Sequence, residues 1–173
     1  MAEPIDKLWA PWRIEYVLQE KPAGCIFCDK ASIEVDDRED LVLSRGKHSF
    51  AIMNLYPYNN GHLMISPYKH TADLGKISDD THLEMFHFMQ QWTTILSDCM
   101  NPEGFNTGAN LGKIAGAGVE EHYHVHIVPR WAGDTNFMPV LGHTKVLVEG
   151  LEETWEKLTE LYEKRFGERN KID

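Results

Sequence analysis

The sequence predicts an α+β fold in which an antiparallel sheet is packed by helices. Short apolar or alternating runs between residues 41 and 128 are separated by turn signals, a pattern typical of strands that meet in hairpins. Two longer stretches, 78–100 and 151–166, repeat apolar residues at helical spacing. Strands that cluster in this way, with long helices between or after them, favour an antiparallel sheet covered by helices. The 173 residues suffice for one domain with its own core.

The first part of the chain should supply a helix, a loop and three strands. Residues 6–19 have the spacing of a short amphipathic helix, with a proline near its first turn. A loop is expected over 21–30, followed by an acidic turn. The strands are expected at Leu41–Ser44, Ser49–Asn54 and His62–Ser66, and the turn-forming sequence Pro57-Tyr58-Asn59-Asn60-Gly61 joins the last two.

The second part should begin with the longest helix. Ser78 is its expected N-cap, and the helix should run to about Met100. Further elements follow in order: a strand at Phe105–Leu111, a glycine-rich turn over 112–118, a histidine-containing strand from His122, a short strand at Lys145–Val148 and a helix over about 151–167. We expect one domain over 1–173, with its N-terminal helix and cysteine loop in about residues 1–35.

The composition argues against several classes of partner. The chain has 27 acidic and 17 basic side chains and a net charge of −10, which disfavours binding to nucleic acid through its phosphates. No leader is apparent and no apolar run approaches a membrane span, so we expect a cytoplasmic protein without a membrane partner. Three cysteines do not resemble a secreted disulfide framework. We also expect no organic cofactor.

Three histidines at alternate positions are the strongest functional signal. His122, His124 and His126 are separated by Tyr123 and Val125. Because strand side chains alternate, the imidazoles should project to one face and the apolar residues to the other. Such a group can bind a metal, act as a nucleophile with proton-handling neighbours, or be purely structural. Cβ atoms two residues apart lie roughly 6.5–7 Å apart, so three cannot all reach one small ion, and His124 is the natural focus.

Cys25 and Cys28 form a second candidate site. Two cysteines at this spacing, in a chain expected to be intracellular, indicate zinc ligation or redox activity. A redox pair should open a helix after a strand, whereas this pair follows Lys21-Pro22-Ala23-Gly24 near the N-terminus. A structural zinc would need two further ligands. Two thiols without a metal are the remaining interpretation.

These motifs resemble the histidine-triad (HIT) superfamily. His122 to Val128 fits its signature of histidines alternating with apolar residues, and Asn54 and Gly61-His62 stand upstream in the expected order. The run Pro129–Asp134 is similar to the Fhit-like and dinucleoside-polyphosphate branches. Three further stretches look most like bacterial diadenosine-tetraphosphate phosphorylases (ATP adenylyltransferases): Leu8–Arg13, Asn106–Gly112 and Gly133–Pro139. The resemblance covers about residues 8–150.

The resemblance implies a HIT-like fold, a homodimer and nucleotidyl transfer through a covalent nucleotidyl-histidine. His124 would be the nucleophile, His126 and His62 would flank the α-phosphate, and Asn54 would contact the ribose. The residues expected to meet the phosphates are Asn110, Gly116, Ala117 and Gly118. Trp131 is close enough in sequence to be a candidate purine neighbour. The nucleophile must carry its proton on the other ring nitrogen, and we expect the acceptor of that proton in the 112–118 turn.

The same resemblance implies a structural zinc. Many relatives complete such a site with the histidine after the third strand and the first triad histidine, which here are His70 and His122. The four expected ligands are therefore Cys25, Cys28, His70 and His122. One departure concerns the leaving group: many members place Ser, Thr or Gln shortly before the triad, whereas Ala117–Glu121 offers no hydroxyl or amide side chain.

The favoured function is cleavage of a dinucleoside polyphosphate, such as diadenosine tetraphosphate, by attack of His124 on an α-phosphate. The expected partners are that nucleotide and inorganic phosphate, the favoured acceptor. Hydrolysis by water, of a dinucleoside polyphosphate or a nucleoside phosphoramidate, is the alternative. Two other possibilities remain open: a zinc-stabilised nucleotide-binding module with little turnover, and a metallohydrolase whose triad holds a catalytic metal.

Overall fold

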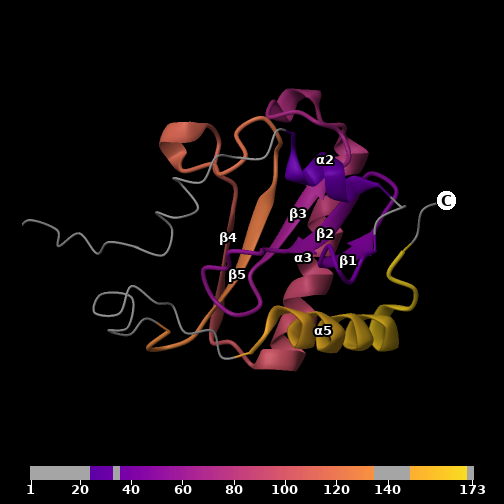
Figure 1. The fold of residues 1–173 in the computed structure, drawn as a ribbon, viewed down its shortest axis with the longest axis vertical. Coiled ribbons are helices and arrows are strands. Elements are labelled where there is room, and N and C mark those ends of the chain that lie inside the picture. The colour runs from indigo at the N-terminus through magenta and orange to yellow at the C-terminus, as the bar shows by residue number, and fades with distance from the viewer. Residues whose placement is uncertain (1–23, 33–35, 135–148, 171–173) are drawn as a thin grey trace, which may run out of the picture.

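The computed structural model describes residues 24–32, 36–134 and 149–170. They form a five-stranded antiparallel sheet in the order β1-β2-β3-β5-β4, with helices, which confirms the predicted class (Figure 1). The strands are β1 (Val42–Arg45), β2 (Ser49–Met53), β3 (Leu63–Pro67), β4 (Gly104–Gly108) and β5 (Val125–Arg130). The helices are α2 (Ile26–Ala31), α3 (Asp79–Met100) and α5 (Leu151–Phe166), with short 3-10 turns η1 (Leu74–Lys76) and η2 (Lys113–Ala115).

Helix α3 begins and ends with local hydrogen bonds. The Ser78 hydroxyl accepts a hydrogen bond from the Thr81 N–H at 3.3 Å, as the N-cap prediction requires. At the other end Asn101 adopts a left-handed conformation, with φ of 48°, and its N–H donates to the Ser97 carbonyl at 3.1 Å. The predicted limits of this helix are thereby confirmed, as are those of α5.

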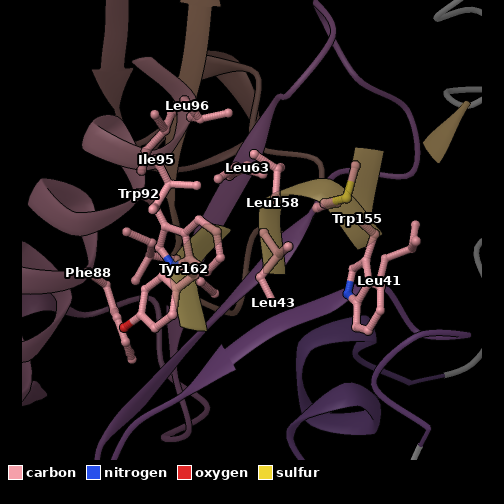
Figure 2. Close-up of a cluster of buried hydrophobic side chains, with 14 of the residues drawn as sticks. Leu41, Leu43, Leu63, Phe88, Trp92, Ile95, Leu96, Trp155, Leu158 and Tyr162 are labelled. Atoms are coloured by element: carbon pink, nitrogen blue, oxygen red, sulfur yellow. The ribbon is translucent and has the colours of Figure 1, made fainter. Parts of the chain in front are cut away.

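The main core lies between one face of the sheet and helices α3 and α5 (Figure 2). Trp92 of α3 is fully buried, and its ring stacks on Tyr162 of α5 with 4.6 Å between ring centroids. Its indole N–H donates to the Ser44 hydroxyl at 3.1 Å, so the buried polar atom is satisfied. The alternating strand residues Leu63, Ile65 and Ile127 point into the same core.

The opposite face of the sheet carries a smaller apolar cluster under the short helix α2. Its buried members are Phe27, Val42, Phe50, Ile52 and Met64. His126 of β5 lies opposite Met64 of β3, and residues directly opposite one another in a ladder share a face. The imidazole face is therefore the one that α3 and α5 leave uncovered, which gives a polar site room beside the core.

Three predicted segments differ from the structure by more than one residue. The expected loop over 21–30 contains helix α2, which six residues form without a periodic pattern that sequence could reveal. Strand β4 ends at Gly108 rather than Leu111, because its last ladder partner is His126. The histidine strand enters the ladder only at Val125, because the Tyr123 N–H donates to the Thr71 carbonyl at 2.8 Å instead of to a strand.

Some expectations fall outside the described residues. The helix over 6–19 and the strand at Lys145–Val148 are among them, and the division of 1–173 into one domain with its N-terminal segment stays a prediction. Within the described part of the chain, none of the helices has the length and apolar character needed to cross a bilayer.

Candidate active site

Four imidazoles gather on the face beneath α2. The ring centroids of His124 and His126 are 4.9 Å apart, and those of His62 and His126 are 5.1 Å apart. Phe27 of α2 lies 4.7 Å from His124 and 5.3 Å from His122, centroid to centroid. Tyr123, Val125 and Ile127 belong to the opposite core, which matches the alternation read from the sequence.

The orientation of His124 is fixed by the backbone just before β5. Its Nδ1 lies 2.8 Å from the His122 carbonyl oxygen, which can only accept, so Nδ1 carries the proton and Nε2 carries the lone pair. The acceptor expected in the 112–118 turn is thus the carbonyl two residues upstream instead. Burial lowers the pKa of His124, which favours the neutral, nucleophilic ring.

The tautomers of His62 and His126 follow from their neighbours. The Tyr58 N–H donates to His62 Nδ1 at 3.0 Å, and the Asn54 side-chain amide lies 3.3 Å from the same nitrogen. The Asn54 side-chain oxygen Oδ1 accepts from the Tyr56 N–H at 2.9 Å, which turns the side-chain amide hydrogens toward His62. His62 therefore carries its proton on Nε2 and donates to His126 Nδ1 at 2.9 Å. His126 must then carry its own proton on Nε2.

The glycine-rich turn leads into the imidazole face. The Asn110 side-chain amide donates to the Gly116 carbonyl at 3.4 Å, and the Ala117 N–H donates to the Gly112 carbonyl at 3.3 Å, so the turn is closed on itself. Val119, just after Gly118, packs against the small apolar cluster that includes Phe27. The residue that follows the turn is therefore on the same side of the sheet as the triad, and phosphate binding by Asn110, Gly116, Ala117 and Gly118 stays a prediction.

Trp131 is not brought to the imidazoles. It follows the C-terminal end of β5, whereas His126 lies at the other end, and five strand residues span roughly 17 Å. Its indole N–H donates to the Asn101 carbonyl at the end of α3, at 3.2 Å. Because the ribose separates a purine from the α-phosphate, this distance does not test the expected contact with a purine, which stays a prediction.

The second site brings two thiols and two imidazoles together. Cys25 Sγ lies 3.3 Å from His122 Nδ1, and Cys28 Sγ lies 3.2 Å from His70 Nδ1 and 3.6 Å from His122 Nδ1. All four atoms lie within 4.8 Å of one another. The other ring nitrogen of His122 donates to the Pro67 carbonyl at 2.8 Å, which directs Nδ1 toward the thiols. Burial, followed by the neighbouring Cys25, raises the pKa of Cys28 to about 11.

The sequence did not predict that two aromatic residues contact the imidazoles, although Tyr58 was among the aromatic candidates for base stacking. Phe27, which lies between Cys25 and Cys28 in the sequence, packs against the rings of His122 and His124. The Tyr58 ring packs on His62 with 4.6 Å between ring centroids. Tyr58 lies in the turn-forming run before Gly61-His62, so the sequence indicates that it is near His62. The hydrogen bond from its backbone N–H to the His62 ring could not be predicted from the residue type. Phe27 gave no signal beyond its position between two metal-ligand candidates.

Comparison with known proteins agrees with this geometry. A family model described as HIT domain matches residues 36–133, which hold the triad, His62 and His70. The chain belongs to the HIT family. A Mycobacterium tuberculosis protein named AP-4-A phosphorylase is 39% identical to this HIT protein over 160 residues, covering 88% of this chain and 82% of the relative.

More distant relatives share the domain. Adenosine 5'-monophosphoramidase hnt1 of Schizosaccharomyces pombe is 29% identical over 107 residues, covering 62% of this chain and 74% of that protein. The crystal structure of a Zn-bound histidine triad family protein from Mycobacterium smegmatis matches with a TM-score of 0.65 and 24% identity, covering 82% of this chain and 94% of that one. At that identity the match supports the fold alone, and it confirms the HIT-like architecture.

Proposed function

We propose that this HIT protein cleaves a dinucleoside polyphosphate, such as diadenosine tetraphosphate, by transferring a nucleotidyl group to His124 and then to inorganic phosphate. Nucleotide processing follows from family membership. The observation that carries the proposal is the bond from His124 Nδ1–H to the His122 carbonyl, which leaves Nε2 as the nucleophile. A relative named AP-4-A phosphorylase, at 39% identity, supports the substrate and the acceptor.

In the first step, the lone pair on His124 Nε2 forms a bond to the α-phosphorus. The bond from phosphorus to the bridging oxygen breaks, and the leaving nucleoside triphosphate takes its electron pair. His124 becomes positively charged, and the His122 carbonyl that accepts its Nδ1–H stabilises this charge. The Nε2–H of His126 can donate to a non-bridging phosphate oxygen, because His62 occupies the other ring nitrogen.

In the second step, an oxygen of inorganic phosphate attacks the same phosphorus and the N–P bond breaks. His124 returns to its neutral form, and a nucleoside diphosphate leaves. Attack by water would use the same residues and release a nucleoside monophosphate instead. The two reactions therefore differ in the acceptor alone. A nucleoside diphosphate product identifies phosphate as the acceptor, and a nucleoside monophosphate identifies water.

The test is cleavage of diadenosine tetraphosphate with and without inorganic phosphate, with sulfate at equal ionic strength as the control. Phosphorolysis predicts ADP and ATP over many turnovers when phosphate is present, and without phosphate at most one ATP per active site and no ADP. AMP and ATP at the same rate in both buffers would show that water is the acceptor. Binding without either set of products would favour the nucleotide-binding module.

We also propose that the four-residue cluster holds a structural zinc. Tetrahedral zinc bonded to sulfur at about 2.3 Å and nitrogen at about 2.0 Å places its ligand atoms roughly 3.3–3.8 Å apart. Three of the six separations between ligand atoms, at 3.2–3.6 Å, fit that geometry, and all six are within 4.8 Å. Four protein ligands would leave no open position for chemistry, so the ion would fasten α2 to the start of the triad strand. This disfavours a metallohydrolase, because only His122 of the triad faces the thiols.

A homodimer formed through the β4 edge is the third part of the proposal. No strand among the described residues pairs with the outer side of β4. Next to it, α3 exposes Leu83 at 55% and Phe86 at 53%, large fractions for apolar side chains on neighbouring turns. A hollow of about 350 Å³ lies between this helix face and Gly108. A second copy could continue the sheet at this edge and bury both apolar side chains.

Replacing Phe86 by Glu should convert the dimer to a monomer, because a charge would have to be buried at the centre of the interface. Light scattering coupled to size-exclusion chromatography should report about half the wild-type mass. Leu74→Glu is the matched control, since Leu74 is also exposed, at 39%, but belongs to η1. A wild-type monomer, or a dimer unaffected by Phe86→Glu, would exclude this interface.

A further inference from the structure

A buried amide ties the loop before β3 to the far end of β5. Asn59 is 8% exposed, and its side-chain nitrogen donates to the Pro129 carbonyl at 3.0 Å and to the Asp134 carboxylate at 2.8 Å. Both amide hydrogens are engaged by residues 70 or more positions away in sequence. These bonds belong to neither the imidazole cluster nor the metal-ligand cluster.

The carboxylate that receives this amide is itself held in place. Arg130 donates to both oxygens of Asp134, and a third nitrogen of the same guanidinium donates to the Asn106 side chain at 2.7 Å. The Trp131 N–H adds a longer bond to Asp134, at 3.4 Å. Arg130, more than Asn59, lowers the pKa of Asp134 to about 2, so the acceptor is an anion at neutral pH. Such charge-assisted bonds are stronger and shorter than neutral ones.

Asn59 is linked through the backbone of its loop to His62 in the imidazole cluster. Asn59 directly follows Tyr58, whose N–H donates to His62 Nδ1 at 3.0 Å. The Asn59 carbonyl accepts from the His62 N–H at 3.2 Å. The turn depends on Gly61, which has φ of +73° and where a Cβ would come within 2.8 Å of the Met100 sulfur. A shift of the Asn59 side chain would therefore move the peptide that donates to His62.

We propose that Asn59 and Asp134 are positioning residues for the reaction: their hydrogen bond holds the Tyr58 N–H on His62 Nδ1 and so keeps the His126 proton on Nε2. Without that bond, the Asn54 amide remains as a longer donor to His62 Nδ1, at 3.3 Å. A fraction of His62 can then take its proton on Nδ1, and its Nε2 accepts from His126 Nδ1. His126 would lose the Nε2–H that faces substrate in the proposed mechanism. The kinetic consequence rests on the proposed function, whereas the tautomer of His62 does not.

The test compares Asn59→Ala and Asp134→Asn with wild-type protein. Glu103→Ala is the matched control, because the Glu103 carboxylate accepts from the Ala132 N–H at 3.0 Å, near the same end of β5. Nitrogen-15 NMR of the histidine rings, recorded without nucleotide, should show one His62 tautomer in wild type and Glu103→Ala. In Asn59→Ala it should show a mixture of both.

Kinetics provide the second readout. In Asn59→Ala, kcat should fall on the order of 10- to 100-fold, since small displacements of a catalytic group cost this much. KM should change by less than about threefold, because the lost contact acts on the transition state rather than on binding. A merely structural role would instead lower the melting temperature and leave the tautomer and the kcat of the folded fraction unchanged.

An unchanged His62 tautomer in folded Asn59→Ala would overturn the inference. If that variant does not fold, Asp134→Asn decides by the same spectrum, because it weakens the contact and keeps the side-chain shape. Wild-type protein that cleaves no dinucleotide would contradict the proposed function, and the tautomer comparison would still test the inference separately.

Discussion

Replacing His124 by Asn should abolish turnover while leaving nucleotide binding intact. The Asn amide can still donate to the His122 carbonyl, as His124 Nδ1 does at 2.8 Å, so the strand should keep its geometry. It has no equivalent of Nε2 and cannot form the bond to phosphorus. We expect kcat to fall by about 10⁴-fold or more, as when a nucleophile is removed from an enzyme that works through a covalent intermediate.

The measurement is the initial rate of diadenosine tetraphosphate cleavage, with calorimetric titration of the same nucleotide. His87→Asn makes the same chemical change at an exposed position on α3 and should keep the wild-type rate. A His124→Asn protein that binds and cleaves at the wild-type rate would place the nucleophile elsewhere. Loss of binding together with loss of the native circular dichroism spectrum would mean that His124 is needed for the fold.

Replacing Cys28 by Ser should remove the metal and destabilise the domain. The four ligands come from the start of α2, from the residues after β3 and from the start of the triad strand, so one ion would link three segments. At a free zinc concentration near 100 times Kd, bound metal stabilises a protein by about 2.7 kcal/mol. For a domain of this size that corresponds to a fall of roughly 5–10 °C in Tm when the metal is lost.

Metal analysis measures the loss of zinc in Cys28→Ser, and scanning calorimetry measures the fall in Tm. The control is Cys99→Ser, since Cys99 packs against the main core and lies outside the metal-ligand cluster. It should retain the metal and melt near the wild-type temperature. Chelation of wild-type protein should slow catalysis only as the fold loosens. Full metal content in Cys28→Ser, or immediate loss of catalysis in a chelated protein that is still folded, would contradict a structural site.

The sequence predicted those features that follow from a local side-chain pattern, such as alternation along a strand or a hydroxyl at a helix N-terminus. Alternation predicted that His124 and His126 share a face opposite Val125 and Ile127, and these apolar residues do lie in or against the main core. Ser78 marked the start of α3, because a hydroxyl before an apolar period satisfies the first N–H groups of a helix. His70 and His122, 52 positions apart, came from the family resemblance rather than from any local pattern, and their rings lie 5.1 Å apart.

Backbone atoms and long-range contacts account for what could not be predicted. The acceptor for His124 is a main-chain carbonyl, which no residue type encodes. The Asn59–Asp134 bond joins residues 75 positions apart, and a turn-forming Asn gives no sign of such a partner. Trp131 is five residues from His126, and an extended strand separates neighbours by about 3.3 Å per residue, so closeness in sequence does not bring its ring to the imidazoles.

Trapping the covalent intermediate tests the central claim most directly. Wild-type protein mixed with diadenosine tetraphosphate in phosphate-free buffer should be quenched within one turnover, digested and analysed by mass spectrometry. We predict an adenylyl group on the peptide that contains His124, bonded to the ring Nε2, with its disappearance on addition of inorganic phosphate matched by ADP. An adenylyl group on another residue, or rapid cleavage with no labelled peptide at any time, would contradict nucleophilic catalysis by His124.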